Sequence, residues 1–360
     1  MKHLTVVAAG TGGHVMPGLA VAQLLAARGW SVSWLGTASG MERGLVQSHG
    51  IDFDAIDFSG LRGKGLRTLA FGGVLLLRAL AQARRHLAAR RPAVVFATGG
   101  YVAVPAGLAA ASLGVPLALL NADAAPLLST RLLRSLAAAI FCGFDGAAAR
   151  LAGDKALVSG VPLRASIAQL PPPAARYAQR SGPLALLVIG GSLGAQALNA
   201  LVPQALAQIE VAQRPRVLHQ CGAAHLQATR AAYAAAGVAA EVVPFIDDIA
   251  ARYAEADVVL CRAGAVTVAE LCAAGVPALL VPLVIRTTRH QAANAEYLAQ
   301  QGAAIHLPQQ GLDPAQLAQT LRRLTRERLL AMAERARALG RPQATGTVAD
   351  ALEHIAGAAA

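Results

Sequence analysis

A glycine-rich segment with a histidine follows the first apolar stretch of the chain. In the segment AAGTGGH, glycines surround Thr11 and His14 comes directly after Gly12 and Gly13. A glycine turn from a strand into a helix presents backbone N–H groups to a phosphate and lets it come close. A histidine in the first helical turn is favoured in its neutral form, so His14 could serve as a general base on a hydroxyl, or it could only cap or pack.

Two further glycine clusters also follow apolar stretches. The segment GGSLG spans residues 190–194 and contains Ser192, and the pair Gly99-Gly100 precedes Tyr101. These loops do not fit the two commonest nucleotide motifs. A dinucleotide fingerprint needs glycine where Val15 stands, and a Walker A loop needs Gly-Lys-Ser/Thr. NAD binding and ATP hydrolysis are therefore disfavoured, while binding of another phosphorylated ligand is favoured.

Carboxylates mark other candidate sites. Glu270 lies in the otherwise apolar segment AVTVAELCAAG, where a carboxylate must be paired, exposed or bound to a ligand such as the diol of a ribose. The D-x-D at Asp52–Asp54 has a form that can bind a metal, but its alternating context favours an edge strand, so no metal site is predicted. The pair Asp247-Asp248 is as well explained by the start of a helix.

Composition narrows the classes of partner. The 360 residues carry a formal charge of +12, but aromatic residues make up only 4%. Anionic partners are expected, and phosphorylated substrates or acidic lipid headgroups fit better than nucleic acid, for which no recognition motif appears. The segment Leu66–His86 is predicted to be an amphipathic helix with flanking arginines. It either faces the core or lies on an anionic membrane surface.

The location of the chain is expected to be cytosolic. Residues 91–123 contain the most apolar stretch, but glycines and prolines interrupt it, so no membrane span is predicted. The N-terminal apolar run is too short for a signal peptide and is expected to be the first strand. The four cysteines form no metal-binding pattern and are expected to be buried, reduced thiols: Cys142, Cys221, Cys261 and Cys272.

Short β-rich runs alternate with Ala/Leu-rich helical stretches, which predicts an α/β fold with parallel sheets. The strands form two sets on either side of residues 159–183, where Pro171-Pro172-Pro173 cannot lie inside a helix or a central strand. Two similar doubly wound domains are therefore expected, with ligands at the carboxyl ends of the strands. The predicted strands are Leu4–Ala8, Ser31–Leu35, Val94–Ala97, Leu117–Leu120 and Ala139–Cys142, then Leu184–Ile189, Arg216–His219, Glu241–Pro244, Asp257–Leu260 and Ala278–Val281.

The motifs together resemble the MurG family of bacterial N-acetylglucosaminyltransferases. The match includes GTGGHVMPGLAVA, SGLRGKG, FATGGYVAVPAG, LLVIGGSLGAQALN, FIDD and HQAANAEYL, in order along nearly the whole chain. The resemblance implies a GT-B fold of two Rossmann-like domains with a cleft between them. It implies inverting transfer of GlcNAc from UDP-GlcNAc to the C4 hydroxyl of the muramoyl-pentapeptide of lipid I, giving lipid II, without a cofactor or metal. It also implies a peripheral position on the cytoplasmic face of the inner membrane, near proteins of cell-wall synthesis and division.

Under this resemblance, residues 1–163 form the acceptor and membrane-facing domain, with helix 342–360 packing back on it, and residues 164–341 bind the donor. His14 is the catalytic base, and Gly99, Gly100 and Tyr101 lie near the acceptor pyrophosphate. The residues implied to bind UDP-GlcNAc are Thr11, Gly12, Gly13, Asp123, Arg164, Ser192, Ile246, Ala265, Val266, Thr267, Val268, Ala269, Glu270 and Gln291.

Two segments depart from the family pattern. The family has HEQN where this chain has Leu120-Asn121-Ala122-Asp123, and it has an acidic pair where this chain has Thr288-Arg289. An ionised aspartate only accepts hydrogen bonds, whereas asparagine also donates them. Two alternatives to the lipid I transferase therefore stay open: a diverged member that binds UDP-GlcNAc with weak or no transfer, and a GT-B enzyme with another acceptor.

Overall fold

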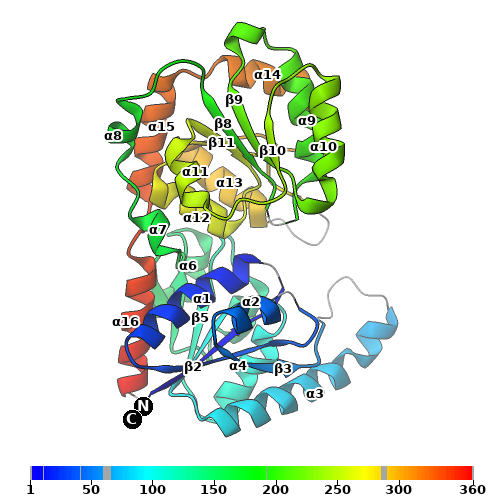
Figure 1. The fold of residues 1–360 in the computed structure, drawn as a ribbon. Helices are drawn as coiled ribbons and strands as arrows, with labels where there is room; N and C mark the ends of the chain where they lie inside the picture. The colour runs from blue at the N-terminus through cyan, green and yellow to red at the C-terminus, as the bar shows by residue number, and fades with distance from the viewer. Residues whose placement is uncertain are drawn as a thin grey trace. The chain divides into compact units, whose positions relative to one another are not determined.

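The computed structural model describes residues 2–10, 12–40, 42–59, 66–191, 193–284 and 290–358, with only the backbone considered for 66–71. The chain divides into two compact units (Figure 1). Unit 1 comprises Met1–Arg164 and Arg341–Ala360, and unit 2 comprises Ala165–Gly340. In the part of the chain that is described, no helix is both long and apolar enough to cross a bilayer.

Unit 1 is built on a parallel sheet of seven strands in the order β3-β2-β1-β4-β5-β6-β7. The chain moves outward from β1 to β3 and then returns to the other side of β1, so the strand order reverses between β1 and β4. Ligands of doubly wound sheets bind beyond the carboxyl ends of the strands at such a point. The strands are β1 His3–Ala8, β2 Ser31–Thr37, β3 Asp52–Ile56, β4 Val94–Gly99, β5 Leu117–Asn121, β6 Ala139–Cys142 and β7 Ala156–Leu157.

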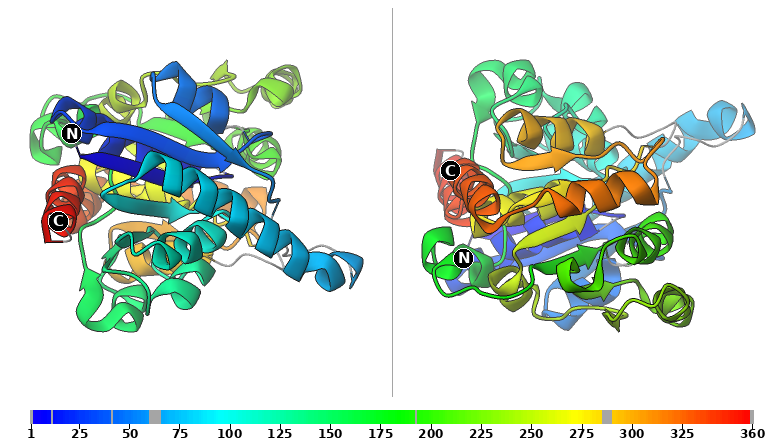
Figure 2. Two further views of the ribbon diagram at one scale, coloured as in Figure 1. Left: turned by 90° about the horizontal axis from the view of Figure 1, so that it is seen from below. Right: turned by 90° about the horizontal axis from the view of Figure 1, so that it is seen from above.

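Helices cover both faces of this sheet. On one face α3 runs alongside α4, which also contacts α5 (Figure 2). On the other face α1 packs against α16. Successive side chains of β4 point to opposite faces of the sheet. Val95 and Ala97 pack against α3 and α4, while Phe96 makes an edge-to-face contact with Phe141. The helices are α1 Gly12–Ala27, α2 Glu42–Ser48, α3 Leu66–Arg90, α4 Ala103–Ser112, α5 Leu128–Leu133, α6 Ala147–Ala152, the 3₁₀ turn η1 Gly153–Lys155 and α16 Ala344–Ala358.

The C-terminal helix α16 belongs to unit 1. Its Val348 and Leu352 are fully buried, and Arg28 forms ion pairs with Asp350 and Glu353 at 2.7 and 2.8 Å. These ion pairs lie near the surface, where such pairs contribute little. Apolar burial therefore supplies most of the free energy that holds α16 in place.

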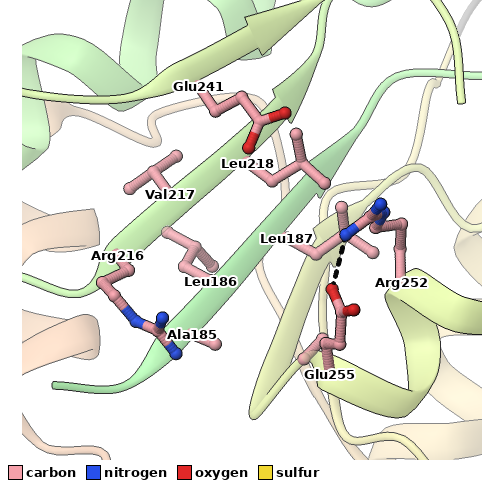
Figure 3. A pocket seen from close by; sticks show the side chains of 10 residues that line it. Ala185, Leu186, Leu187, Arg216, Val217, Leu218, Glu241, Arg252 and Glu255 are labelled. Carbon is pink, nitrogen blue, oxygen red and sulfur yellow. Dashed lines mark hydrogen bonds and ion pairs between the residues drawn. The ribbon is translucent and has the colours of Figure 1, made fainter. Parts of the chain in front are cut away.

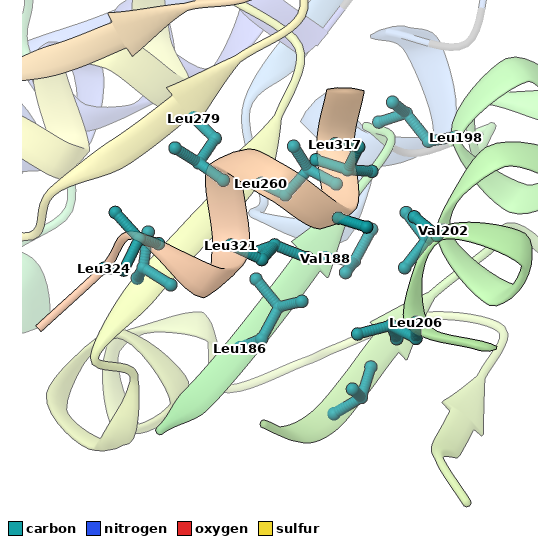
Figure 4. Packing of buried hydrophobic residues seen from close by; sticks show 14 of the residues in the cluster. Leu186, Val188, Leu198, Val202, Leu206, Leu260, Leu279, Leu317, Leu321 and Leu324 are labelled. Carbon is teal, nitrogen blue, oxygen red and sulfur yellow. The ribbon is translucent and has the colours of Figure 1, made fainter. Parts of the chain in front are cut away.

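Unit 2 has a parallel six-stranded sheet in the order β10-β9-β8-β11-β12-β13. Leucines of α9 and α14 pack on one face of it, over Leu186 and Val188 of the central strand β8 (Figure 4). The strands are β8 Ala185–Ile189, β9 Arg216–Gln220, β10 Glu241–Val243, β11 Val258–Cys261, β12 Ala278–Leu280 and β13 Ala304–His306. The helices are α7 Ala165–Ala168, α8 Pro173–Tyr177, α9 Gln196–Ala207, η2 Val211–Gln213, η3 Ala223–His225, α10 Leu226–Ala235, α11 Ile249–Glu255, α12 Ala265–Ala274, α13 His290–Gln300, α14 Pro314–Arg322 and α15 Arg326–Leu339.

The proline cluster lies inside unit 2, a few residues after the division at Arg164. Pro173 is buried and occupies the first turn of α8, where proline is tolerated because the N–H it lacks has no helical partner. Arg176 of the same helix donates to the carbonyls of Tyr253, Ala274 and Gly275. Burial lowers the pKa of Arg176 to about 10, which still leaves it charged at neutral pH. The segment thus anchors the start of unit 2.

Candidate active site

In unit 1 the first glycine loop joins the end of β1 to the start of α1. Gly10 has φ +103, and Gly12 and Gly13 are the first residues of a 16-residue helix. Thr11 lies outside the described residues. The start of a helix carries the positive end of the helix dipole, which is a feature of anion-binding sites.

His14 sits directly behind this loop and against the Gly99-Gly100 pair. The residue is half-buried, and its Nδ1 is shielded from solvent. Thr98 Oγ1 donates to the His14 carbonyl oxygen at 2.7 Å. A side chain at Gly99 would collide with the His14 ring, and one at Gly100 would collide with the Ala9 carbonyl. The structure therefore brings the first and third glycine clusters together at the ends of β1 and β4.

Glu42 supports the same loop and has no counterpart among the sequence-based candidates. Its carboxylate is fully buried. It accepts hydrogen bonds from the backbone N–H of Thr37 at 3.0 Å and from Thr37 Oγ1 at 2.7 Å, and a longer one from Gly10 N–H at 3.4 Å. The buried charge is thus satisfied by donors, and it links the end of β2 to the glycine loop.

Tyr101 follows the glycine pair and is partly exposed. Its ring centroid lies 6.2 Å from that of Phe58. Both residues line a cavity of about 320 Å³, which also contains Thr37, Ser39, Asp57 and Leu75. Polar and apolar groups therefore share this cavity at the carboxyl ends of β2 and β3.

The segment that departs from the family pattern has its own hydrogen-bond network. Asn121 is fully buried at the end of β5, and its Nδ2 donates to the carbonyls of Asp123 and Ala125. Its Oδ1 accepts from Leu127 N–H at 2.8 Å and from Thr130 Oγ1 at 2.9 Å. Four hydrogen bonds therefore fix the loop that carries Asp123, whose side chain is largely buried.

In unit 2 the second glycine loop follows β8. Gly191 and Gly194 have φ +86 and +79, and Gly194 N–H donates to the Gly191 carbonyl at 2.9 Å. Side chains at Gly194 or Gly222 would collide with the backbone of the neighbouring loop, so glycine is required for the two loops to touch. Ser192 lies outside the described residues.

Helix α12 carries the largest group of candidate donor-binding residues. Its first six residues run from Ala265 to Glu270, after Gly264. Glu270 is only 5% exposed, and Tyr253 Oη lies 3.4 Å from its Oε2. Ile246, half-buried, follows β10 in the next loop. Asp248 caps α11 by accepting from Ala251 N–H at 3.1 Å, which confirms the helix-start interpretation for this residue.

Two amides of α13 connect it to neighbouring loops. Gln291 Oε1 accepts from Leu283 N–H at 2.8 Å, so its NH₂ group is the half available to a sugar hydroxyl. Asn294, fully buried, donates to the Ala263 carbonyl at 3.0 Å, a contact that sequence reasoning did not predict. Thr288 and Arg289 lie outside the described residues. Arg164, half-buried, is the last residue of the first segment of unit 1.

The D-x-D segment forms edge strand β3, which confirms that interpretation. Its two carboxylates are bound by Arg90, at 2.6 Å from Asp52 and 2.9 Å from Asp54. They hold the pKa of the Arg90 guanidinium above its ordinary value. Across the described ranges, no group of three or more potential metal ligands occurs.

A second cavity, of about 460 Å³, lies away from the glycine loops. It is lined by the first residues of β8, β9 and β10, including Arg216 and Glu241, and by the Arg252–Glu255 ion pair of α11 (Figure 3). In a parallel sheet these residues mark the amino ends of the strands. The cavity is therefore not part of the candidate site at the carboxyl ends.

Comparison with known proteins identifies the family. Residues 4–142 match the glycosyltransferase family 28 N-terminal domain, and residues 185–354 match the family 28 C-terminal domain. The chain is 56% identical to relatives in Methylibium petroleiphilum (98% of each chain) and Herminiimonas arsenicoxydans (99% of each). Both relatives are named UDP-N-acetylglucosamine–N-acetylmuramyl-(pentapeptide) pyrophosphoryl-undecaprenol N-acetylglucosamine transferase.

A solved structure agrees with these relatives. The crystal structure of Acinetobacter baumannii MurG has a TM-score of 0.82 and 38% identity, covering 98% of this chain and 100% of that one. The two all-parallel α/β units are those of the GT-B glycosyltransferase fold, as expected from the sequence. The chain therefore belongs to glycosyltransferase family 28, and within it to the MurG family.

Proposed function

We propose that this enzyme transfers GlcNAc from UDP-GlcNAc to the C4 hydroxyl of the muramoyl-pentapeptide of lipid I and so makes lipid II. The observation that carries the proposal is 56% identity over 98% of both chains to a transferase named for this donor group and this class of acceptor. The glycine loops, His14 and Glu270 supply groups that such a reaction needs.

The donor is assigned mainly to unit 2. The glycine loop with Ser192 is proposed to bind the phosphates together with Arg164, and the Ile246 backbone is proposed to bind uracil. The segment Ala265–Glu270 is proposed to bind the nucleoside. Glu270 is proposed to accept two hydrogen bonds from the ribose hydroxyls, because an ionised carboxylate only accepts hydrogen bonds. Gln291 donates to the hydroxyls of the GlcNAc through its NH₂ group.

The acceptor and the base are assigned to unit 1. Thr11, Gly12 and Gly13 are proposed to border the donor sugar and the acceptor pyrophosphate, with Gly99, Gly100 and Tyr101 nearby. His14 removes the proton from the acceptor hydroxyl through Nε2, since Nδ1 is shielded from solvent. The deprotonated oxygen attacks the anomeric carbon of GlcNAc from the face opposite UDP. UDP departs with the bonding electron pair, and the configuration of the anomeric carbon is inverted.

Negative charge develops on the departing UDP. Backbone N–H groups at helix starts and Arg164 are proposed to stabilise it, so transfer is expected to proceed without a cofactor or added metal. Asp123 takes the place of the family's asparagine. Its loop is held by Asn121 through four hydrogen bonds. The 56% identity to a named transferase favours an active enzyme over a binding protein that has lost transfer.

The acceptor lipid lies in a membrane, and we propose that exposed apolar side chains of unit 1 bind this membrane. On α3, Val74 and Leu77 are each 66% exposed, whereas Ala79, Ala83 and Leu87 of the same helix are buried in the core. Leu128 and Leu132, on α5, and Leu136, in the turn that follows α5, are also exposed. Arginines flank both groups, which suits an anionic leaflet. We assign these surfaces to the cytoplasmic face of the inner membrane.

A transfer assay tests the proposed function. Radiolabelled UDP-GlcNAc is incubated with a short-chain lipid I analogue and the purified full-length protein in the presence of a metal chelator. Labelled disaccharide-lipid is the expected product. Binding of UDP-GlcNAc without product would favour the diverged binding protein. Product with a different glycolipid acceptor but none with the lipid I analogue would favour the other GT-B enzyme.

A further inference from the structure

A buried amide lies at the end of β9, between two loops of the donor site. Gln220 is 5% exposed and is the last residue of its strand. In the sheet it is opposite Ile189, the last residue of β8, and opposite Val243, the last residue of β10. The glycine loop begins directly after Ile189, and the loop with Ile246 begins directly after Val243.

The Gln220 side chain contacts both loops. Its Nε2 donates to the Gly191 carbonyl at 2.9 Å and lies 3.5 Å from the Pro244 carbonyl. An amide nitrogen carries two N–H donors, and both directions lead to backbone oxygens that can only accept. These partners fix the orientation of the amide, with NH₂ toward the two carbonyls.

Both carbonyls also receive backbone hydrogen bonds. Gly194 N–H donates to the Gly191 carbonyl at 2.9 Å, and Gly222 N–H donates to the Pro244 carbonyl at 3.2 Å. A carbonyl oxygen has two lone pairs, so each of these oxygens has a full set of donors. The loops after β8, β9 and β10 are thus linked through Gln220 and the backbone around it.

We propose that Gln220 is a positioning residue for UDP-GlcNAc. It holds the loop after β8 and the loop after β10 at a fixed separation, so that the phosphate-binding and uracil-binding backbones meet one nucleotide without prior rearrangement. A site ordered in advance binds more tightly because less conformational freedom is lost on binding. The inference rests on the proposed function, which places the phosphates at the first loop and uracil at the second.

The sharpest variant is Gln220→Glu, because the two side chains have nearly the same shape. Glutamate at neutral pH would place a carboxylate oxygen against two carbonyl oxygens. We expect the Kd for UDP-GlcNAc, measured by titration calorimetry on the full-length protein, to rise at least tenfold. With saturating donor, kcat and the KM for the lipid I analogue stay within about threefold, because Gln220 touches neither the acceptor nor the reacting atoms.

Lowering the pH separates positioning from simple loss of structure. A protonated glutamate can donate one hydrogen bond, and burial raises the pKa of a carboxyl group. The donor affinity of Gln220→Glu should therefore recover in part between pH 8 and pH 6. Gln220→Asn keeps the NH₂ group but is one methylene too short to reach both carbonyls. Gln220→Asn should show the same loss of affinity for UDP-GlcNAc, with no recovery at lower pH. If Gln220→Glu does not fold, the Kd of Gln220→Asn tests the proposal.

Tyr233→Phe is the matched control in the same unit. It removes the buried hydroxyl that lies 2.9 Å from His219 Nδ1 and should lower stability while leaving donor affinity unchanged. Donor affinity within twofold of wild type in both Gln220 variants would overturn the inference, as would an equal loss of affinity in Tyr233→Phe. A wild-type protein that fails to bind UDP-GlcNAc would contradict the proposed function itself, and this inference with it.

Discussion

His219 Nε2 lies 3.0 Å from Asn199 Oδ1, in the interior of unit 2. Asn199 Nδ2 donates to the Cys221 carbonyl at 3.0 Å, which fixes the amide orientation and leaves Oδ1 as an acceptor. The Nε2 atom therefore carries the proton of a neutral imidazole, and Nδ1 accepts from the Tyr233 hydroxyl at 2.9 Å. Protonation at Nδ1 would remove that acceptor.

Stability should fall in acid because of this histidine. Burial lowers the pKa of His219 to about 4, whereas an unfolded histidine has a pKa of about 6.5. Between these values the unfolded state binds more protons than the folded state, so the free energy of unfolding decreases as pH falls from about 6.5 to about 4. The decrease attributable to His219 is about 2 kcal/mol at pH 5.

Urea unfolding at pH 7.5 and pH 5 measures this effect. His219→Gln removes the titrating group, so the variant should be less stable at pH 7.5 but should lose less stability between the two values. Other groups, such as His3, whose pKa burial also lowers, titrate equally in both proteins. The same pH dependence in variant and wild type would show that His219 is not the source.

Asn121→Ala should destabilise unit 1. It removes one partner from each of four hydrogen bonds in a buried loop, and the expected cost is about 2–4 kcal/mol. Thr130→Val removes only one of these bonds and should cost about 1 kcal/mol. Thermal unfolding of the two variants gives the comparison. A loss in Asn121→Ala no larger than that in Thr130→Val would mean that the network does not hold the loop.

Glu270→Gln should weaken donor binding. A hydrogen bond to a charged acceptor is worth about 1.5–3 kcal/mol, so the KM for UDP-GlcNAc is expected to rise about 10- to 100-fold, with a smaller effect on kcat. Tyr253→Phe removes the hydroxyl at 3.4 Å from the carboxylate and should raise KM less. Steady-state kinetics with varied donor measure both. A lower kcat at unchanged KM would place Glu270 outside the ribose site.

Removing the exposed apolar side chains of α3 should weaken membrane binding. Val74→Glu combined with Leu77→Glu replaces two residues that are each 66% exposed. Sedimentation with anionic phospholipid vesicles should show at least a tenfold loss of binding, with UDP-GlcNAc affinity unchanged. Val211→Glu in unit 2, at a site 77% exposed, is the control. Equal vesicle binding by the α3 variant and the control would exclude α3 as the contact.

Much of the fold could be predicted because its signals are local. Apolar runs followed by glycine predicted β1 and β8 to within one residue at either end. Two strands were not predicted: β7 has two residues and β13 has three. Shortness alone does not explain this, because β10 and β12 also have three residues and were predicted. The order of β7 and β13 comes from pairing with β6 and β12.

Candidate site residues could be proposed from the sequence where the signal is a glycine cluster or an isolated charge in an apolar segment. The glycine loops and Glu270 carry such signals. Glu42, Gln220 and Asn294 do not, because their roles come from backbone groups of other elements. Gln220 carries only the weak signal of a polar residue between a predicted strand and the pair Cys221-Gly222.

The role of His14 is the central claim, and the most direct measurement compares wild type with His14→Ala. Transfer of labelled GlcNAc to the lipid I analogue is followed together with UDP-GlcNAc binding. Loss of a general base should lower kcat by about 10²–10⁴, while donor affinity stays within about threefold. A His14→Ala enzyme with near-normal kcat would contradict the assignment of His14 as the base.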